Sequence, residues 1–318
     1  GPEPRILVVP LGRVCFRHSR TEIYDMAHGM KKAFLLLTLL CFLAPCRGTA
    51  ATVGYTEQLE SGSVDWHGNL VLSSAEVSWN GDQPQGRDSD RLAVRHALIQ
   101  ARGRLFKALQ SIVVDRDTVT ASLLEGDQSR LEQVRGMVHN APIQNILRRG
   151  DKSLEVTVGI DLYDGLARAV VPEIAWIEAG SGLGRDHDRA TAAETWTGSR
   201  LAPDGYTGLI VDARGYEAHP ALLPRVLDQE GREIYGPGLA EKSVALQRGM
   251  AQYLSGLDEA GLLERVGKRP LHLRAMGVSG KYKCDLVIGQ FFARDILAVS
   301  KTRQALSQCR VIILMDGP

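Results

Sequence analysis

The stretch YTGLIVDARGYEAHPALLPRVLDQEGREIYG, Tyr206 to Gly236, decides how the C-terminal half of the chain folds. Its apolar run, residues 209–211, is too short for a helix and is bounded by turn residues, so it predicts a buried strand. Gly215 and Gly231 stand where the chain must reverse, because glycine accepts a positive φ without a Cβ clash. Residues 225–235 are typical of a β-hairpin with a loop longer than two residues.

Working outward, we expect residues 204–318 to form a C-terminal α/β-type domain. The further elements expected there are a helix over 239–254, strands over 271–275 and 285–288, and a helical stripe of Phe292, Ile296 and Val299. The continuous apolar run from Val311 to Met315 predicts a central strand, which we expect beside the Leu209 strand. Residues 179–203 are rich in glycine and polar side chains and are predicted to be a linker.

Residues 62–178 are predicted to form a separate N-terminal domain. A hairpin is expected over Asp65–Trp79, and strict alternation over Leu154–Leu162 indicates a half-buried antiparallel strand. Between them, Ser89 is the expected N-cap of a long amphipathic helix, and Asp127–Val138 predicts a second helix. The inward stripe of the first helix is expected to be Val94, Leu98, Ala101, Leu105, Ala108 and Ile112. Helices on a sheet of this kind predict an α+β fold with two domains, each a mainly antiparallel or mixed sheet covered by helices.

Two sets of residues carry a resemblance to known families. The alanine-rich helix with Ala93, Ala97 and Ala101, followed by Ile112-Val113-Val114-Asp115 and the Leu154–Leu162 strand, resembles the N-terminal domain of flagellar assembly protein T and related LPP-type envelope lipoproteins. The stretch TGLIVDARG to GREIYG, with the tail CRVII at residues 309–313, is similar to the C-terminal half of uncharacterised secreted bacterial proteins. The resemblance implies an exported, non-enzymatic protein of the envelope or flagellum.

The N-terminal segment predicts export. Met30-Lys31-Lys32 and the apolar residues 33–44 have the form of a signal peptide, residues 30–51, with cleavage expected after Ala50 or Ala51. Residues 1–29 are interpreted as an upstream or non-native segment. The alternatives are a retained membrane anchor and a lipoprotein modified at Cys46. After signal cleavage no stable transmembrane span is expected, because the apolar stretch is shorter than the roughly 18–20 residues that cross a bilayer.

Two cysteines, Cys284 and Cys309, lie outside that segment. In an oxidising compartment they could form a cross-strand disulfide. The alternative is that both are small buried hydrophobic residues. Their spacing does not match a metal-ligand motif.

One pair of residues, Asp212 and His219, could carry out acid–base chemistry, and it lies at the turn after the buried strand. Together with Arg214 these two residues make up a candidate functional turn. Asp212 can equally cap its own turn. We expect no catalytic, cofactor-binding or metal-binding residues. Asp186-His187-Asp188 lacks partner ligands, and Gly180-x-Gly182-x-Gly184 lacks the spacing of a nucleotide loop.

The functional expectation is therefore an exported bacterial envelope protein, periplasmic or outer-membrane-associated, that acts as a non-catalytic structural or interaction module. Its expected partners are envelope or flagellar basal-body proteins or the cell wall. The net charge of +1 argues against a nucleic-acid partner. The alternatives are a periplasmic hydrolase that uses Asp212 and His219 and a small-ligand binder at the interdomain cleft.

Overall fold

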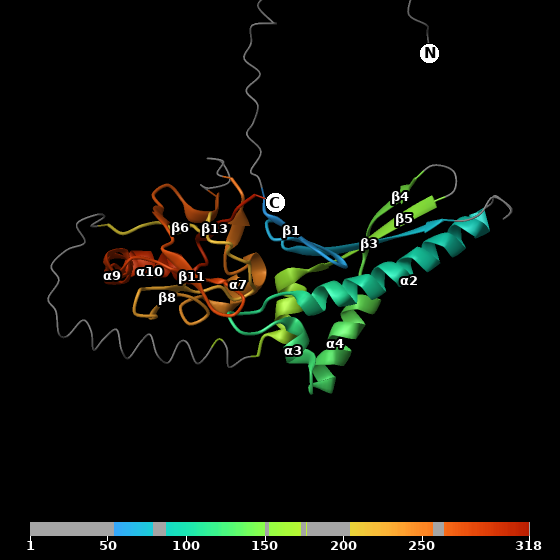
Figure 1. The fold of residues 1–318 in the computed structure, drawn as a ribbon, viewed down its shortest axis with the longest axis horizontal. Coiled ribbons are helices and arrows are strands. Elements are labelled where there is room, and N and C mark those ends of the chain that lie inside the picture. The colour runs from blue at the N-terminus through green and yellow to red at the C-terminus, as the bar shows by residue number, and fades with distance from the viewer. Residues whose placement is uncertain are drawn as a thin grey trace, which may run out of the picture. The chain divides into compact units, whose positions relative to one another are not determined.

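The computed structural model describes residues 54–78, 87–149, 153–172, 176, 204–256 and 264–317 (Figure 1). Ala51–Pro318 forms one compact unit, and the other unit, Gly1–Ala50, lies outside the described residues. The expected upstream segment, the signal peptide with Cys46 and the linker over 179–203 also lie outside them. None of the described helices is both long and apolar enough to cross a membrane.

The first part of the unit, residues 54–176, is called the N-terminal lobe below. It contains a five-stranded antiparallel sheet in the order β1-β2-β3-β5-β4. Its strands are β1 Thr56–Leu59, β2 Gly62–Asp65, β3 Leu70–Ser78, β4 Ile143–Arg148 and β5 Ser153–Asp161. Its helices are α2 Arg87–Ser111, α3 Thr120–Leu124, α4 Gln128–His139, η1 Leu162–Ala167 and α5 Arg168–Val170.

Helix α2 covers one face of this sheet over β3 and β5 (Figure 1). The expected inward stripe is confirmed, since Ala101, Leu105, Ala108 and Ile112 are buried and the preceding members of the stripe pack against the same core. The N-cap prediction is wrong, because α2 begins at Arg87 and Ser89 lies inside the helix. Several consecutive polar residues can begin a helix there, so residue preference alone did not fix the first turn.

The alternating strand and the first hairpin are confirmed. Strand β5 pairs with β3 along its whole length, from Leu70 opposite Asp161 to Ser78 opposite Ser153. Strands β2 and β3 form the antiparallel hairpin across the turn at residues 66–69. Strand β4 pairs with β5 on one side and forms the outer edge of the sheet. The N-terminal lobe therefore has the predicted α+β plan.

The C-terminal lobe, residues 204–317, contains two sheets. One is entirely parallel in the order β10-β6-β13-β9, and the other has the order β11-β12-β7-β8. The strands are β6 Leu209–Asp212, β7 Val226–Leu227, β8 Glu233–Tyr235, β9 Gln252–Leu254, β10 Leu271–Arg274, β11 Gly277–Ser279, β12 Asp285–Val287 and β13 Val311–Leu314. The helices are α7 Lys242–Arg248, α9 Gln290–Ala298 and α10 Ser300–Ser307.

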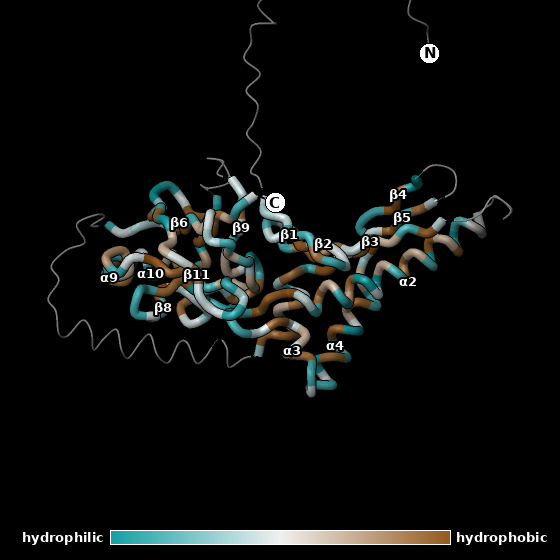
Figure 2. Tube along the Cα trace, in the orientation of Figure 1, coloured by the Kyte–Doolittle hydropathy of each residue, from teal (hydrophilic) through white to brown (hydrophobic). Residues whose placement is uncertain are grey.

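The central predictions for this lobe are confirmed. Strand β6 is buried and lies beside β13, with Leu209 opposite Val311, and β7 and β8 form the expected hairpin. Chain segments that are hydrophobic in Figure 2 run through the middle of both lobes, as buried strands require. The sequence indicated a mainly antiparallel or mixed sheet for each domain. In the first of the two sheets of this lobe, all neighbouring strands are parallel.

The prediction of a helix over residues 239–254 is wrong for the second half of that range. Helix α7 ends at Arg248, Gly249 adopts φ +79°, and the chain continues as strand β9 beside β13. Met250 and Leu254 are buried as expected. Sheet pairing buries them, however, and an apolar pattern this short does not distinguish a helix from a strand.

The two lobes share one hydrophobic core and several backbone hydrogen bonds. A single cluster of buried side chains includes residues of both lobes. The Tyr55 amide donates to the Tyr253 carbonyl at 3.2 Å, and the Leu222 amide donates to the Val113 carbonyl at 3.0 Å. Residues 113–114 thus form an extended segment whose carbonyls accept from the amides of residues 222–223 of the other lobe.

Gly249 provides a test of this junction. A Cβ at residue 249 would lie 2.6 Å from Cε2 of Tyr163, and the positive φ disfavours any side chain. We expect Gly249→Ala to lower the free energy of unfolding by about 2 kcal/mol, measured by urea denaturation. Gly231→Ala is the control for a positive φ alone, because its φ is +80° and its Cβ would meet no described atom within 4 Å, whereas Gly249 combines φ +79° with ψ 155°. Equal losses in the two variants would contradict the close packing of Tyr163 against Gly249.

Candidate functional site

The carboxyl ends of the four parallel strands meet at one edge of their sheet. Asp212, at the end of β6, lies opposite Arg274 of β10 on one side and Leu314 of β13 on the other. Ligands of open parallel sheets commonly bind at this edge, outside the strand ends. The candidate turn that the sequence singled out is thus in the part of the sheet where a site is expected.

Asp212 is engaged by its near neighbour Arg214. The guanidinium donates from Nε to Oδ1 at 2.8 Å and from Nη2 to Oδ2 at 2.7 Å, and the Arg214 amide also donates to Oδ1 at 3.1 Å. The hydrogen bond from the Arg214 side chain is the main reason why the pKa of Asp212 is lowered, with Arg274 contributing through its charge. A carboxylate held in its ionised form in this way is a weak proton acceptor.

Two further residues complete this turn. Both carboxylate oxygens of Asp316 accept from the Gly215 amide, at 3.0 and 2.9 Å, and Nη2 of Arg274 donates to the Arg214 carbonyl at 3.3 Å. Asp316 was not singled out from the sequence. Its position just after the apolar run of β13 was the available signal, because that strand was expected beside β6. The charged side chains at this edge are therefore engaged within the turn: Asp212 pairs with Arg214, and Asp316 and Arg274 bond to backbone groups.

His219 takes no part in the Asp212 cluster. Its amide donates to the Lys283 carbonyl at 3.1 Å and its side chain is exposed. Burial raises the pKa of Glu57 of β1, and the hydrogen bond from Trp66 and the nearby His219 offset part of that rise. Among the described residues no hydrogen bond joins Asp212 to His219. The structure therefore places this candidate acid–base pair in two different environments.

The structure does not contain the candidate disulfide, which was one of the two alternatives that the sequence left open. Cys284 and Cys309 are both free and buried. Cys284 directly precedes β12 in one sheet, and Cys309 precedes β13 in the other, so the two strands that they flank do not pair. Burial raises the pKa of Cys284 to about 12 and raises that of Cys309 as well. Both thiols are therefore protonated and behave as small buried hydrophobic residues, which was the alternative interpretation.

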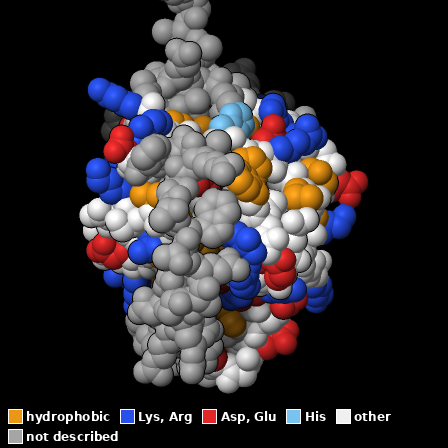
Figure 3. All heavy atoms as spheres, turned by 90° about the vertical axis from the view of Figure 1, so that its left-hand side faces the viewer, with side chains coloured by type: hydrophobic (Ala, Val, Ile, Leu, Met, Phe, Trp, Pro, Cys, Tyr) orange, Lys and Arg blue, Asp and Glu red, His pale blue; other side chains and the backbone are white. Residues whose placement is uncertain are grey.

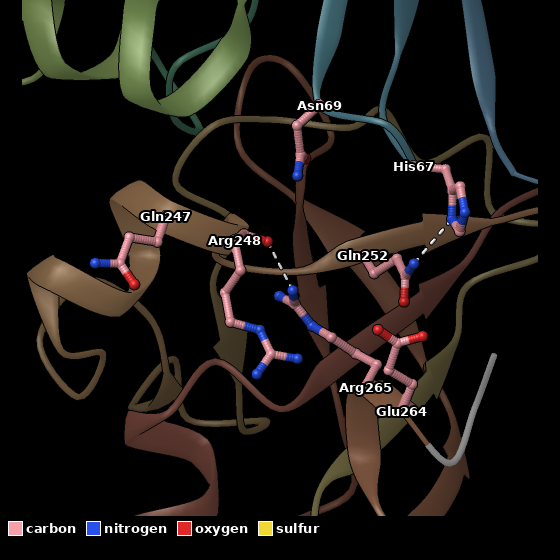
Figure 4. Close-up of a pocket in the computed structure, with 7 residues that line it drawn as sticks. All are labelled: His67, Asn69, Gln247, Arg248, Gln252, Glu264 and Arg265. Atoms are coloured by element: carbon pink, nitrogen blue, oxygen red, sulfur yellow. Dashed lines mark hydrogen bonds between the residues drawn. The ribbon is translucent and has the colours of Figure 1, made fainter. Parts of the chain in front are cut away.

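A polar cavity of about 490 Å³ lies where the two lobes meet (Figure 4). We call it the junction cavity. Its lining is His67, Asn69, Gln247, Arg248, Gln252, Glu264 and Arg265. The first two come from the turn between β2 and β3, and the others come from the C-terminal lobe. None of these residues was identified from the sequence, since the cavity exists only when the lobes are packed.

Arg265 is the most unusual of these residues. It is only 7% exposed, and its guanidinium donates from Nη1 to the Arg248 carbonyl at 2.6 Å and from Nη2 to the Gly249 carbonyl at 2.8 Å (Figure 4). Its Nε has no hydrogen-bond partner, and no described carboxylate forms an ion pair with it. Burial lowers the pKa of this guanidinium. The site therefore holds a buried cation whose counter-charge is missing among the described residues.

Metal chemistry has no support in the described part of the chain, where no cluster of three or more His, Cys, Asp or Glu side chains could hold an ion. The Asp186-His187-Asp188 run lies outside the described residues.

The fold and these sites define a two-lobed α+β protein whose C-terminal lobe is built on a parallel sheet. Residues 208–317 of that lobe match the family model of the second domain of Treponema pallidum Tp0624. The match covers about a third of the chain and agrees with the expected similarity of the C-terminal half to bacterial proteins. It lies outside residues 62–178 and gives no support to the flagellar assembly protein T resemblance there. No curated protein matches the chain.

Proposed function

We propose that this chain is an exported protein of the bacterial cell envelope that acts as a non-catalytic interaction module. The signal-like segment over residues 30–51 and the similarity to a bacterial domain support the compartment and the source. The proposed partners are envelope or flagellar basal-body proteins or the cell wall. A flagellar role rests on the sequence resemblance of residues 62–178 alone.

Strand β4 is the observation that carries the interaction role. It is the outer strand of the five-stranded sheet, and every residue in it is exposed. Ile143, Ile146 and Leu147 are 41%, 46% and 44% exposed. Proteins usually protect an edge strand of this kind, because its free amides and carbonyls can pair with another chain. An exposed apolar edge is suited to binding a partner by strand addition.

The geometry around Asp212 favours binding over hydrolysis. A general base must reach the proton that it removes and needs a pKa near the working pH. The carboxylate of Asp212 is occupied by Arg214, which lowers its pKa. On the parts of the face that Figure 3 leaves uncovered, basic and acidic side chains are mixed with apolar groups and do not gather into one basic patch of the kind that binds nucleic acid.

We expect the double variant Ile146→Lys and Leu147→Lys to lose at least about tenfold in recovery of envelope partners, because two charges on an edge strand oppose strand addition. The measurement is cross-linking and co-purification of the full chain from fractionated native cells. Both residues are exposed, so the melting temperature should change by no more than a few degrees.

The control is His272→Lys, which places one lysine at an exposed polar position of β10, the edge strand of the parallel sheet. Partner recovery should be unchanged in that variant. Intact protein in the cytoplasm with its leader attached would contradict the proposal. Hydrolytic activity that disappears on Asp212→Ala would favour the hydrolase instead.

A further inference from the structure

We propose that the junction cavity binds a small zwitterionic ligand, one that carries a carboxylate and an ammonium group, as the ends of a short peptide do. This site is separate from strand β4 and does not depend on the interaction role proposed above. Its volume of about 490 Å³ lies within the range of small-molecule pockets. Most such pockets are apolar, whereas all seven side chains that line this one are polar or charged. The ligand must therefore be polar itself.

The carboxylate end of the ligand is assigned to the two arginines. Arg265 is a buried cation whose Nε has no hydrogen-bond partner, and a buried charge without a counter-charge is unfavourable. The guanidinium of Arg248 lines the same cavity and makes no ion pair with a described residue. A ligand carboxylate would supply the counter-charge that both lack and would accept hydrogen bonds from planar donors suited to it.

The ammonium end is assigned to Glu264 and Gln252. The Glu264 carboxylate lines the cavity and forms no ion pair within the described part of the chain. The Gln252 amide donates from Nε2 to Nδ1 of His67 at 2.8 Å, which leaves its carbonyl oxygen as an acceptor (Figure 4). Because the lining carries both positive and negative charges, it should bind a ligand with both a positive and a negative group more tightly than a simple anion.

Ligand binding would also depend on the packing of the two lobes, because both contribute residues to the cavity lining. His67 and Asn69 belong to the N-terminal lobe, while both arginines and Glu264 belong to the C-terminal lobe. A molecule that binds only when these residues are assembled stabilises the folded state by mass action. Binding should therefore be visible as a rise in melting temperature as well as in a direct titration.

The test titrates the full chain with glycylglycine, N-acetylglycine, glycinamide and inorganic phosphate by calorimetry, with melting temperature as the second readout. We expect glycylglycine to bind at least about tenfold more tightly than any of the other probes, since only it satisfies both ends. Arg248→Gln should weaken glycylglycine binding at least about tenfold. Glu264→Gln should remove the preference for glycylglycine over N-acetylglycine.

Arg248 and Glu264 are used because neither is fully buried, so their variants should fold, whereas loss of the buried Arg265 would disturb the core. Arg294→Gln, an exposed arginine on α9, is the matched control and should bind like the wild type. Absence of binding at about 10 mM of every probe would overturn the proposal. Equal binding of phosphate and glycylglycine, unaffected by Glu264→Gln, would also overturn it and would indicate a simple anion site.

Discussion

Replacing Trp66 with alanine should lower the free energy of unfolding by about 3–5 kcal/mol, the range for deleting a buried indole. Trp66 is only 1% exposed and lies at the end of the β2–β3 hairpin. Its ring meets Tyr253 of β9 edge-on, with 5.3 Å between the ring centroids, and its Nε1 donates to Glu57 Oε2 at 2.9 Å. Because Tyr253 belongs to the other lobe, the cavity left behind would weaken both lobes together.

Urea denaturation of the full chain measures this loss. Trp66→Phe is the matched control, because it keeps an aromatic ring in the core and removes the indole hydrogen bond, so we expect a loss of only about 1–2 kcal/mol. Circular dichroism and tyrosine fluorescence should report the same transition in both variants. A loss below about 1 kcal/mol for Trp66→Ala, or two separate transitions in the wild type, would contradict a shared core.

Asp285→Asn should make the protein more stable at pH 8 by about 1–2 kcal/mol, less than the full pKa shift implies because the nearby arginine charges screen the carboxylate. Asp285 is fully buried on β12. Its carboxylate oxygens have no hydrogen bond of standard geometry. Burial raises its pKa to about 6 from an ordinary value of 3.8, although the nearby charges of Arg225 and Arg116 and, by less, the Arg225 backbone amide lower it. The closest cationic atom, Nε of Arg116, is 3.8 Å away. The ionised carboxylate is therefore held in an unfavourable environment above pH 6.

The raised pKa of Asp285 determines how the free energy of unfolding changes with pH. Between pH 3.8 and 6 the folded protein holds a proton on Asp285 that the unfolded chain releases, so stability falls as pH rises through this window. Asparagine does not titrate and should remove that fall. The measurement is the difference in unfolding free energy between the wild type and Asp285→Asn from about pH 4 to 8.

Taking this difference cancels the contributions of other carboxyl groups, including Glu233 nearby, whose pKa is also raised by burial. Asp228→Asn is a control with the opposite expectation. Asp228 is also buried, but it accepts hydrogen bonds from the Glu230 and Arg232 amides and from the Arg232 side chain. Its loss should destabilise the protein at pH 8. A constant difference across the pH range would contradict a raised pKa at Asp285.

Local sequence patterns predicted the elements whose residues repeat with a clear period. The alternating strand β5, the inward stripe of α2 and the apolar strands β6 and β13 all came from such patterns. The prediction was wrong over residues 250–254, where a few apolar residues after Gly249 are compatible with either a helix or a strand. Pairing with β13 decides between them, and that partner lies far along the chain.

The candidate turn was found in the same way, but its chemistry was not. Asp212 and Arg214 are close in sequence, so their pairing could be anticipated, whereas Asp316 reaches Gly215 only through the packing of β13 against β6. The free cysteines have a similar explanation. Cys284 and Cys309 each lie next to a strand that the sequence predicted. The sequence did not show that these two strands belong to different sheets.

The sequence by itself determined the α+β class, the strands at the centre of each lobe and the hairpins, because these depend on side-chain periodicity and turn residues close along the chain. Only the tertiary structure decided the environments of Asp285 and Arg265, the separation of Asp212 from His219 and the existence of the junction cavity. Those properties arise where segments distant in sequence exclude water together, and burial of that kind leaves no periodic signal in either segment.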